Sequence, residues 1–334
     1  MAMPSLPTTI QLIFTGGTIS MQIDPLVGAA VPALTGNEIL STVTHLDEHI
    51  TARSFDYGQL PGPHVTPQVM WDLAGVIRRF LDDPQVNGVV VTHGTDTLEE
   101  TAYFMDLLLD TEKPVVFTGA MRNASELGFD GPANLRDAIL VAAAPAARGM
   151  GVLVCLNEQI VAAAEATKTH TEEQGTFQSP NFGPLGIVDT GKVLFYRRPI
   201  LRETIPAVRL EEPVDLFKMY TGADDRMIRY AVDSGAQGLV IEALGRGNVP
   251  PAVVPGIQYA LAKGLPVVIT SRAVRGRVLD TYGYEGAGRS LRNMGVIFAD
   301  YLNSQKARIK LMLALGATHD PSQVKQYFEE GRYD

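Results

Sequence analysis

The sequence contains a single cysteine, Cys155, among 334 residues. One cysteine cannot form an intramolecular disulfide, so this is not a small disulfide-stabilised protein, and the pattern fits a reducing compartment. The cysteine and the six histidines offer no metal site that their spacing supports. His45 and His49 have the i, i+4 spacing of a zinc motif, but the residues between them do not match HExxH, and we expect a solvated helix face there.

Long apolar runs and positive charge are also scarce. The longest apolar runs, such as Ala138–Ala144, fall well short of the roughly 18 residues that span a bilayer. The first residues, MAMPSLPTTIQLIF, lack the basic region and the long apolar core of a signal peptide. With 28 Lys and Arg against 37 Asp and Glu, the formal charge is −9, which opposes attraction to nucleic acid or to an anionic membrane. We therefore expect a cytoplasmic protein with neither as a partner.

What the sequence does contain is enough apolar material for two cores. Hydrophobic residues make up 46% and charged residues 19%, and at roughly 100–200 residues per domain the length predicts two domains. Short runs rich in Val and Ile alternate with helix-period segments, which is typical of βαβ units and a parallel sheet. The expected strands are Thr9–Phe14, Gly88–Val91, Pro114–Phe117, Val152–Leu156, Gly238–Ile241 and Leu265–Ile269. The expected helices are Pro67–Leu81, Thr97–Leu109 and Ser304–Leu315, the last ended by Gly316.

The segment Arg197–Pro213 has three prolines, seven charged residues and no clean period. Such a composition is typical of an interdomain linker. We predict an N-terminal catalytic domain over residues 1–197, a linker over 198–217 and a C-terminal α/β domain over 218–334. The fold class is α/β: a larger N-terminal domain with a parallel-rich open sheet flanked by helices, and a smaller C-terminal domain.

Three of the expected strands end in threonine and glycine. They are IFTGGT at Ile13–Thr18, VVTHGTDT at Val90–Thr97 and VVFTGA at Val116–Ala120. Ligands bind outside the carboxyl ends of strands in open parallel sheets, and glycines there allow the backbone to approach a ligand closely. Three such turns at equivalent strand ends would converge on one polar pocket.

Each candidate residue in these turns also has a purely structural interpretation. Thr18 could cap a turn, Asp96 or Thr97 could cap the following helix, and most lysines, such as Lys168, are solvated surface charges. TGGT matches neither a phosphate loop nor a dinucleotide fingerprint, and the chain has no GxSxG elbow. Taken together, however, Thr95, Asp96 and Lys168 would form a hydroxyl, carboxylate and amine set, and an amine held neutral by burial can activate a threonine nucleophile or water.

Taken in order, several motifs resemble the bacterial-type L-asparaginase family over nearly the whole chain. They are TGGTIS (Thr15–Ser20), HGTDTLEETAYF (His93–Phe104), TGAMR (Thr118–Arg122), DGPANLRDA (Asp130–Ala138), TKTHT (Thr167–Thr171), FQSPNFGPLG (Phe177–Gly186), GRGN (Gly245–Asn248) and NSQKARIKLMLAL (Asn303–Leu315). The resemblance implies hydrolysis of the side-chain amide of L-asparagine to aspartate and ammonia, with room for minor glutaminase activity. It implies no metal and no organic cofactor.

The resemblance also assigns roles to individual residues. Thr18 would be the nucleophile that forms an acyl-enzyme, Thr95 and Lys168 would handle protons or the water, and Asp96 would also hold the α-ammonium group of the substrate. Backbone amides near Thr95 would stabilise the oxyanion. The implied substrate contacts are Gly17, Gly62, Pro63, His64, Gly94, Thr95, Asp96, Ala120 and Asn248. Asn248 would reach the site of a neighbouring subunit, in a homodimer or homotetramer.

One departure from the family concerns a tyrosine. The family usually carries one in the lid after TGGT, but Met21–Gly36 contains none and the first tyrosine of the chain is Tyr57. Local alignment puts the missing position near Ala29 or Ala30. The second hypothesis is therefore a binding or regulatory protein for asparagine or aspartate, with weak or lost hydrolysis.

A second departure lies in LPGPH, Leu60–His64. The family often has a serine there that binds the substrate α-carboxylate, and Gly62 stands in its place, which leaves backbone amides or His64 for this role. Two weaker alternatives are an amidase of tRNA-dependent transamidation and a dehydrogenase with the same sheet architecture. Because the motif begins at Thr15, we expect no extra N-terminal domain of the transamidation type, and the charge of −9 argues against tRNA. The dehydrogenase rests on the sheet architecture, and fold alone carries no function.

Overall fold

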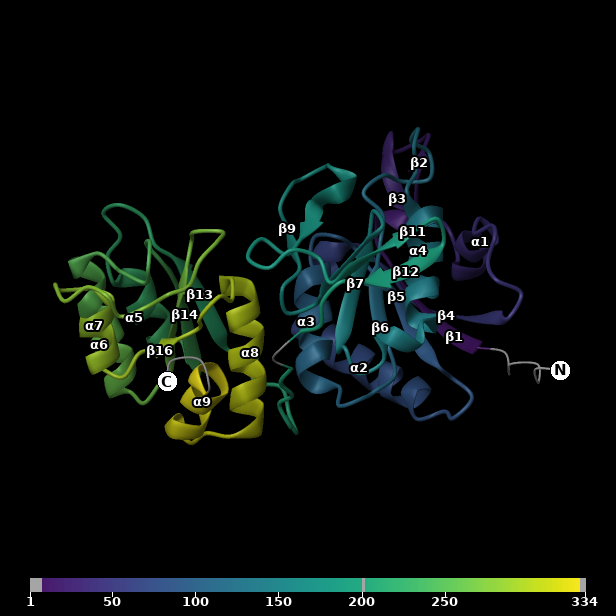
Figure 1. The fold of residues 1–334 in the computed structure, drawn as a ribbon. Helices are drawn as coiled ribbons and strands as arrows, with labels where there is room; N and C mark the ends of the chain where they lie inside the picture. The colour runs from purple at the N-terminus through teal and green to yellow at the C-terminus, as the bar shows by residue number, and fades with distance from the viewer. Residues whose placement is uncertain (1–7, 200–201, 331–334) are drawn as a thin grey trace. The chain divides into compact units, whose positions relative to one another are not determined.

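The computed structural model describes residues 8–199 and 202–330, and the chain divides into two compact units, Met1–Thr204 and Ile205–Asp334 (Figure 1). Each unit has its own sheet and its own hydrophobic core. Over the described ranges, every helix is too short or too polar to cross a membrane.

The first unit is built on an eight-stranded sheet in the order β12-β11-β8-β7-β6-β5-β1-β4. Its strands are β1 (Thr8–Gly16), β4 (Ile50–Leu60), β5 (Gly88–Thr92), β6 (Val115–Thr118), β7 (Val152–Leu156), β8 (Gln159–Ala162), β11 (Gly186–Asp189) and β12 (Lys192–Phe195). Strands β4, β1, β5, β6 and β7 run parallel, and β8, β11 and β12 extend the sheet antiparallel. Every residue of β5 and β6 is buried, because helices cover both faces, and this explains their uninterrupted valine runs.

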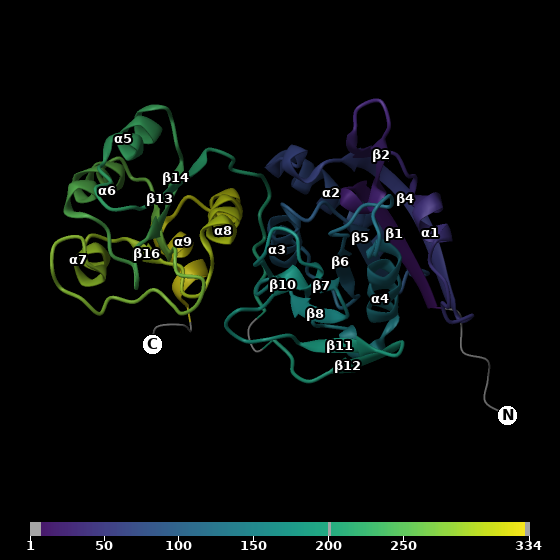
Figure 2. The ribbon, with the colours of Figure 1, turned by 90° about the horizontal axis from the view of Figure 1, so that it is seen from above.

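Helices cover the two faces of this sheet (Figure 2). One face carries α1 (Gly36–Ser41) and α4 (Gly131–Ala143), and the other carries α2 (Pro67–Leu81) and α3 (Leu98–Leu108). Leu135 and Ile139 of α4 share a core cluster with Leu12 and Val90 of the central strands. Since alternate side chains of a strand point to opposite faces, the buried neighbours of these strand residues face α2 and α3.

Short elements complete the first unit. A hairpin of β2 (Met21–Asp24) and β3 (Ala29–Pro32) follows β1, and β9 (Thr167–Lys168) pairs with β10 (Phe177–Gln178). Two 3-10 helices, η1 (Thr18–Ser20) and η2 (Gly62–His64), follow β1 and β4. Both begin where a parallel strand ends, so they lie at the edge of the sheet where ligands usually bind.

The second unit has a parallel four-stranded sheet in the order β13-β14-β15-β16. Its strands are β13 (Val214–Lys218), β14 (Gly238–Ala243), β15 (Val267–Ser271) and β16 (Ile297–Phe298), and its helices are α5 (Arg226–Asp233), α6 (Val254–Ala262), α7 (Gly288–Asn293), α8 (Ser304–Ala317) and α9 (Pro321–Glu329). The buried helix α8 packs against β13, β14 and β15. The predicted fold class, an α/β chain with a larger N-terminal and a smaller C-terminal part, is confirmed.

The predicted strands and helices all occur, but three details differ from expectation. The expected linker, 198–217, overlaps β13, which begins at Val214 and pairs with β14. Gly316 does not end its helix but lies inside α8. A methyl group there would lie 2.0 Å from the carbonyl oxygen of Arg209, so glycine is needed for close approach of the chain rather than for a cap.

The predicted helix face at His45 and His49 is also wrong. Helix α1 ends at Ser41, and His45 follows in a left-handed conformation with φ of 59°. A left-handed residue interrupts the helical hydrogen bonds, so the two imidazoles do not share a helix face.

Candidate active site

The carboxyl ends of β4, β1 and β5 meet through three glycines. A methyl group on Gly17 would lie 2.5 Å from the Cα of Gly94, and one on Gly94 would lie 2.6 Å from the Cα of Gly62. No side chain fits at such distances, so the three backbones touch directly. The predicted convergence of TGGT and HGTDT is therefore present, and it brings LPGPH to the same point.

Lys168 reaches this point from β9, a distant part of the chain. Its Nζ donates to Thr95 Oγ1 at 3.0 Å and to Asp96 Oδ1 at 2.7 Å. The lysine side chain is 16% exposed and Thr95 is buried, whereas the Asp96 side chain is 61% exposed. One carboxylate oxygen of Asp96 is thus oriented by the ammonium group, while the carboxylate as a whole stays accessible to a ligand.

Thr97 has a different partner from the one that helix capping predicts. It occupies the N-cap position of α3, but its side chain makes no capping bond. Its hydroxyl instead donates to the Gly62 carbonyl at 2.8 Å, and the Thr15 hydroxyl donates to the Thr92 carbonyl at 2.7 Å. These two bonds tie β4 to β5 and β1 to β5, so the strand-end threonines hold the glycine contacts in place.

His93 is a buried neutral group directly behind the Gly94–Thr95 turn. Burial lowers its pKa to about 4, although a bond to Gly94 raises it in part. Its Nδ1 lies 2.9 Å from the Gly94 carbonyl oxygen, which can only accept, so Nδ1 carries the proton. The imidazole therefore supports the turn and does not act as a charged group at neutral pH.

The third strand end, after β6, is held by the start of α4. The Asp130 carboxylate accepts from the Met121 amide at 3.0 and 3.1 Å, and Asn134 Nδ2 donates to the Gly119 carbonyl at 3.0 Å. Ala120, between these bonds, is fully buried. Sequence reasoning gave no role to Asp130 or Asn134; their i, i+4 spacing within the DGPANLRDA motif was the available signal.

The remaining predicted residues lie in different places. Thr18 is half-buried in η1, next to Gly17 and therefore next to the glycine contact. Pro63 and His64 are exposed in η2, beside Gly62. Asn248 belongs to the second unit, where it pairs with Leu244 and its Oδ1 accepts from the Gly288 amide at 3.3 Å.

The hairpin β2–β3 lies within Met21–Gly36, the segment where the resemblance predicts a lid. Its Ile23 amide donates to Ser125 Oγ at 3.0 Å, and the rest of the hairpin is largely exposed. Ala29 and Ala30, near which we expected the position of the family's tyrosine, are both exposed. Among the described residues, no cluster of His, Cys, Asp and Glu side chains could hold a metal ion.

Comparison with known proteins identifies the family. The family model "Asparaginase, N-terminal" matches residues 9–201, and "Glutaminase/Asparaginase C-terminal domain" matches residues 213–328. The chain belongs to the asparaginase family. It is 39% identical over 308 residues to an L-asparaginase of Bacillus licheniformis, covering 92% of this chain and 95% of the relative.

Two further relatives agree with this assignment. A probable periplasmic L-asparaginase of Haemophilus influenzae is 35% identical, covering 96% of this chain and 92% of the relative. The crystal structure of a probable cytoplasmic L-asparaginase from Campylobacter jejuni matches with a TM-score of 0.86 and 32% identity, covering 96% of this chain and 99% of that one. The resemblance drawn from the motifs is thus confirmed, and the enzyme is a hydrolase of the asparaginase type.

Proposed function

We propose that this asparaginase hydrolyses the side-chain amide of L-asparagine through an acyl-enzyme on Thr18, with glutamine as a poorer substrate. The observation that carries the proposal is the contact of Lys168 with both Thr95 and Asp96. The residue before Thr95, Gly94, touches Gly17, which is the residue before Thr18. A hydroxyl nucleophile beside a second hydroxyl, an amine and a carboxylate is the set of groups that acyl transfer requires, and this supports the proposal.

The reaction has two halves. The Thr18 hydroxyl oxygen attacks the amide carbon, its proton passes to the leaving nitrogen, and the C–N bond breaks to release ammonia and leave an ester. Water then attacks the ester carbon, and aspartate leaves as the proton returns to Thr18. Thr95 and Lys168 handle the proton and position the water, while backbone amides near Thr95 stabilise the oxyanion.

Substrate binding in this proposal uses the exposed side of the same cluster. The carboxylate of Asp96 accepts from the substrate α-ammonium group with the accessible part of its surface. Backbone amides near Gly62, with the exposed His64, receive the α-carboxylate. The remaining contacts we propose are Gly17, Pro63, Gly94, Ala120 and Asn248.

We also propose that the enzyme is a homodimer or homotetramer in the cytoplasm. Catalysis is assigned to the predicted domain 1–197, which lies in the first unit, whereas Asn248 lies in the second. We propose that Asn248 acts on the site of a neighbouring subunit. The acidic charge of −9 supports a small zwitterionic substrate rather than nucleic acid or a membrane as the partner.

The test is ammonia release over concentration series of L-asparagine and L-glutamine. We expect turnover of asparagine and its loss in Thr18→Ala, with Thr44→Ala as the control because Thr44 is an exposed threonine remote in sequence from the motifs. Turnover retained by Thr18→Ala would contradict the nucleophile assignment.

A second candidate function is favoured by the lid. Since Met21–Gly36 has no tyrosine, the chain could bind asparagine or aspartate without efficient hydrolysis. Calorimetry that detects aspartate binding, together with no ammonia at high enzyme concentration, would select this function over the first.

A further inference from the structure

The Asp130 carboxylate, just before α4, accepts hydrogen bonds from three donors in the loop after β6 and in α4. The Met121 amide donates to both of its oxygens, at 3.1 and 3.0 Å, and the Arg122 amide donates to Oδ1 at 2.9 Å. Asn134 Nδ2 donates to Oδ2 at 3.0 Å and, at the same distance, to the Gly119 carbonyl. The carboxylate therefore fixes the position and the rotation of the peptide groups after β6.

Asn134 is itself held by a second strand end. It is buried, and its Oδ1 accepts from the amide of Asn157, in the turn after β7, at 2.9 Å. Its Nδ2 already donates to Asp130 and to Gly119, so both ends of the side-chain amide have partners. The support of Asp130 is thus fixed in orientation before a substrate arrives.

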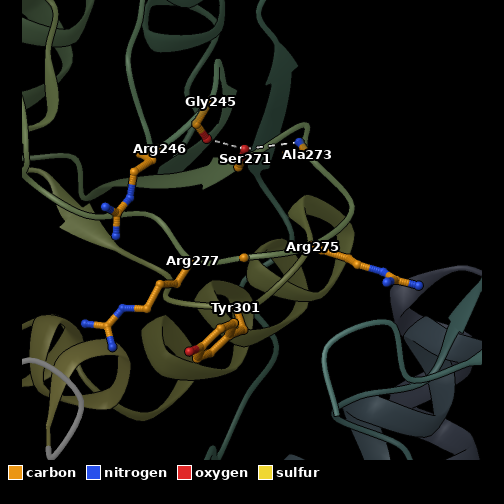
Figure 3. A pocket seen from close by; sticks show the side chains of 8 residues that line it. Gly245, Arg246, Ser271, Ala273, Arg275, Arg277 and Tyr301 are labelled. Carbon is orange, nitrogen blue, oxygen red and sulfur yellow. Dashed lines mark hydrogen bonds between the residues drawn. The ribbon is translucent and has the colours of Figure 1, made fainter. Parts of the chain in front are cut away.

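A strand end can be held with fewer bonds than these. At the end of β15 in the second unit, the neutral hydroxyl of Ser271 donates to the Gly245 carbonyl at 2.5 Å and accepts from the Ala273 amide at 3.1 Å (Figure 3). Two bonds to one hydroxyl are enough for that turn. A carboxylate that accepts from two successive amides orients each peptide group more strongly, because hydrogen bonds to a charged acceptor are the stronger ones.

The bond from Met121 determines the direction of the Ala120 carbonyl. The N–H and C=O of a trans peptide group point in opposite directions, and the described residues contain no cis peptide bond. The Met121 amide points to Asp130, at the start of α4. The Ala120 carbonyl belongs to the same peptide group, so it points away from α4.

The end of β6 lies against the turn that carries Thr95. A methyl group on Gly119 would lie 2.6 Å from the His93 carbonyl oxygen and 3.4 Å from Thr95 Cγ2. Ala120 is fully buried, and within the described part of the chain no donor bonds its carbonyl oxygen. Buried backbone carbonyls nearly always have a partner, so a donor supplied by the substrate explains this open acceptor beside the site.

We propose that Asp130 is a positioning residue that directs the Ala120 carbonyl toward the leaving nitrogen of the substrate amide. This inference rests on the proposed hydrolysis of L-asparagine. The amide nitrogen offers an N–H that the carbonyl accepts, whereas the leaving oxygen of an ester offers none and leaves the buried acceptor unpaired. Asp130 therefore makes the site select an amide over an ester of the same acid.

The test compares L-asparagine with the β-methyl ester of L-aspartate. Both give the same acyl-enzyme, so they differ only in the leaving group. In Asp130→Ala we expect the ratio of kcat/KM for the amide to kcat/KM for the ester to fall about tenfold, the effect of one buried hydrogen bond. Asp130→Asn keeps one acceptor oxygen for the Met121 amide and should recover part of this ratio; it is also the test variant if Asp130→Ala does not fold.

Asp106→Asn is the matched control. The buried Asp106 carboxylate also accepts from a backbone amide, that of Val152 at 2.8 Å, but at the amino end of β7 and so at the opposite edge of the sheet. Its replacement should leave the ratio unchanged even where it lowers stability. An equal fall of both kcat/KM values in Asp130→Ala, or the same change of ratio in Asp106→Asn, overturns the positioning role.

Binding to Thr18→Ala provides the same comparison without turnover. Calorimetry should show tighter binding of asparagine than of the ester, and this preference should disappear when Asp130→Ala is added. A preference that survives in the double variant, or that is absent from Thr18→Ala, contradicts the inference. No turnover by the unchanged chain, with the preference present and dependent on Asp130, rejects only the proposed hydrolysis and supports the positioning role.

Discussion

Lys168 is the residue whose replacement tests the proposed chemistry most directly. Lys168→Met keeps most of the aliphatic stem but removes the donor to Thr95 and Asp96. Loss of a group that moves a proton lowers kcat by about 10²–10⁴-fold. Steady-state kinetics with L-asparagine should therefore show a fall in kcat in this range, with the protein still folded.

The matched control is Lys113→Met. Lys113 Nζ donates to the carbonyls of Leu81 and Asp83, at 2.5 and 2.8 Å, so it is also a partly buried, hydrogen-bonded lysine. Its loss should reduce stability and leave kcat unchanged. An equal drop of kcat in both variants would mean that Lys168 acts only in folding.

The sequence predicted the members of this cluster but not the bonds that support it. Asp96 and Lys168 are 72 positions apart, and only motif order linked them. Thr97 shows what the sequence does not reveal. A threonine just before a helix matches the capping pattern whether its hydroxyl caps the helix or donates to another residue. Its bond to Gly62 depends on the packing of β4 beside β1, which local sequence does not encode.

Asp137 of α4 should make stability depend on pH. Burial raises its pKa to about 6, with Glu158 adding to the rise and Arg136 opposing it. A folded pKa above the unfolded value of about 3.8 means that the folded protein gains protons on acidification. Burial of the ionised Asp137 therefore lowers the free energy of unfolding above pH 6, and this destabilisation disappears as the pH falls toward 4.

Asp137→Asn should remove this destabilisation. We expect the variant to exceed the wild type in free energy of unfolding at pH 7, and the difference to shrink steadily by pH 4. Urea denaturation at several pH values measures it, with the exposed Asp215→Asn as the control. A difference that stays constant between pH 7 and pH 4 would show that Asp137 does not titrate as described.

At the scale of the elements, alanine substitutions at two helical glycines test two effects separately: helix propensity at Gly75 and close packing at Gly316. A methyl group on Gly75 of α2 would meet nothing within 4 Å, whereas one on Gly316 of α8 would collide with the Arg209 carbonyl. Alanine stabilises a free helical position by about 0.5–1 kcal/mol relative to glycine. Gly75→Ala should raise the melting temperature and Gly316→Ala should lower it, as calorimetry will measure; a rise in both would refute the contact at Gly316.

The elements that the sequence revealed are those with a continuous buried face. The all-buried strand β5 was evident from its valine run, but β4 (Ile50–Leu60) was not predicted. Within the described sheet β4 is an edge strand that pairs with β1 alone, and many of its residues are exposed. Without two covered faces an edge strand needs no apolar run, so composition does not reveal it.

At the scale of the whole molecule, the proposed site draws on both units. Thr18 lies in the first and Asn248 in the second. Because a closed dimer contains the same contact twice, each subunit would provide Thr18 to one site and Asn248 to the other. If the site is shared in this way, a mixture of two inactive variants should regain activity, which would not happen if each subunit held a complete site.

Thr18→Ala and Asn248→Ala, each of low activity alone, should complement when co-expressed. In a mixed dimer one site has lost both residues, and the other combines an intact Thr18 with an intact Asn248 from the neighbour. If subunits associate at random, half of the dimers are mixed and about a quarter of all sites are restored. Ammonia release should therefore recover to about a quarter of the wild-type rate per chain. If Asn248 serves its own subunit, every site in the mixture lacks one of the two residues, and no recovery beyond the average of the separate variants will be measured.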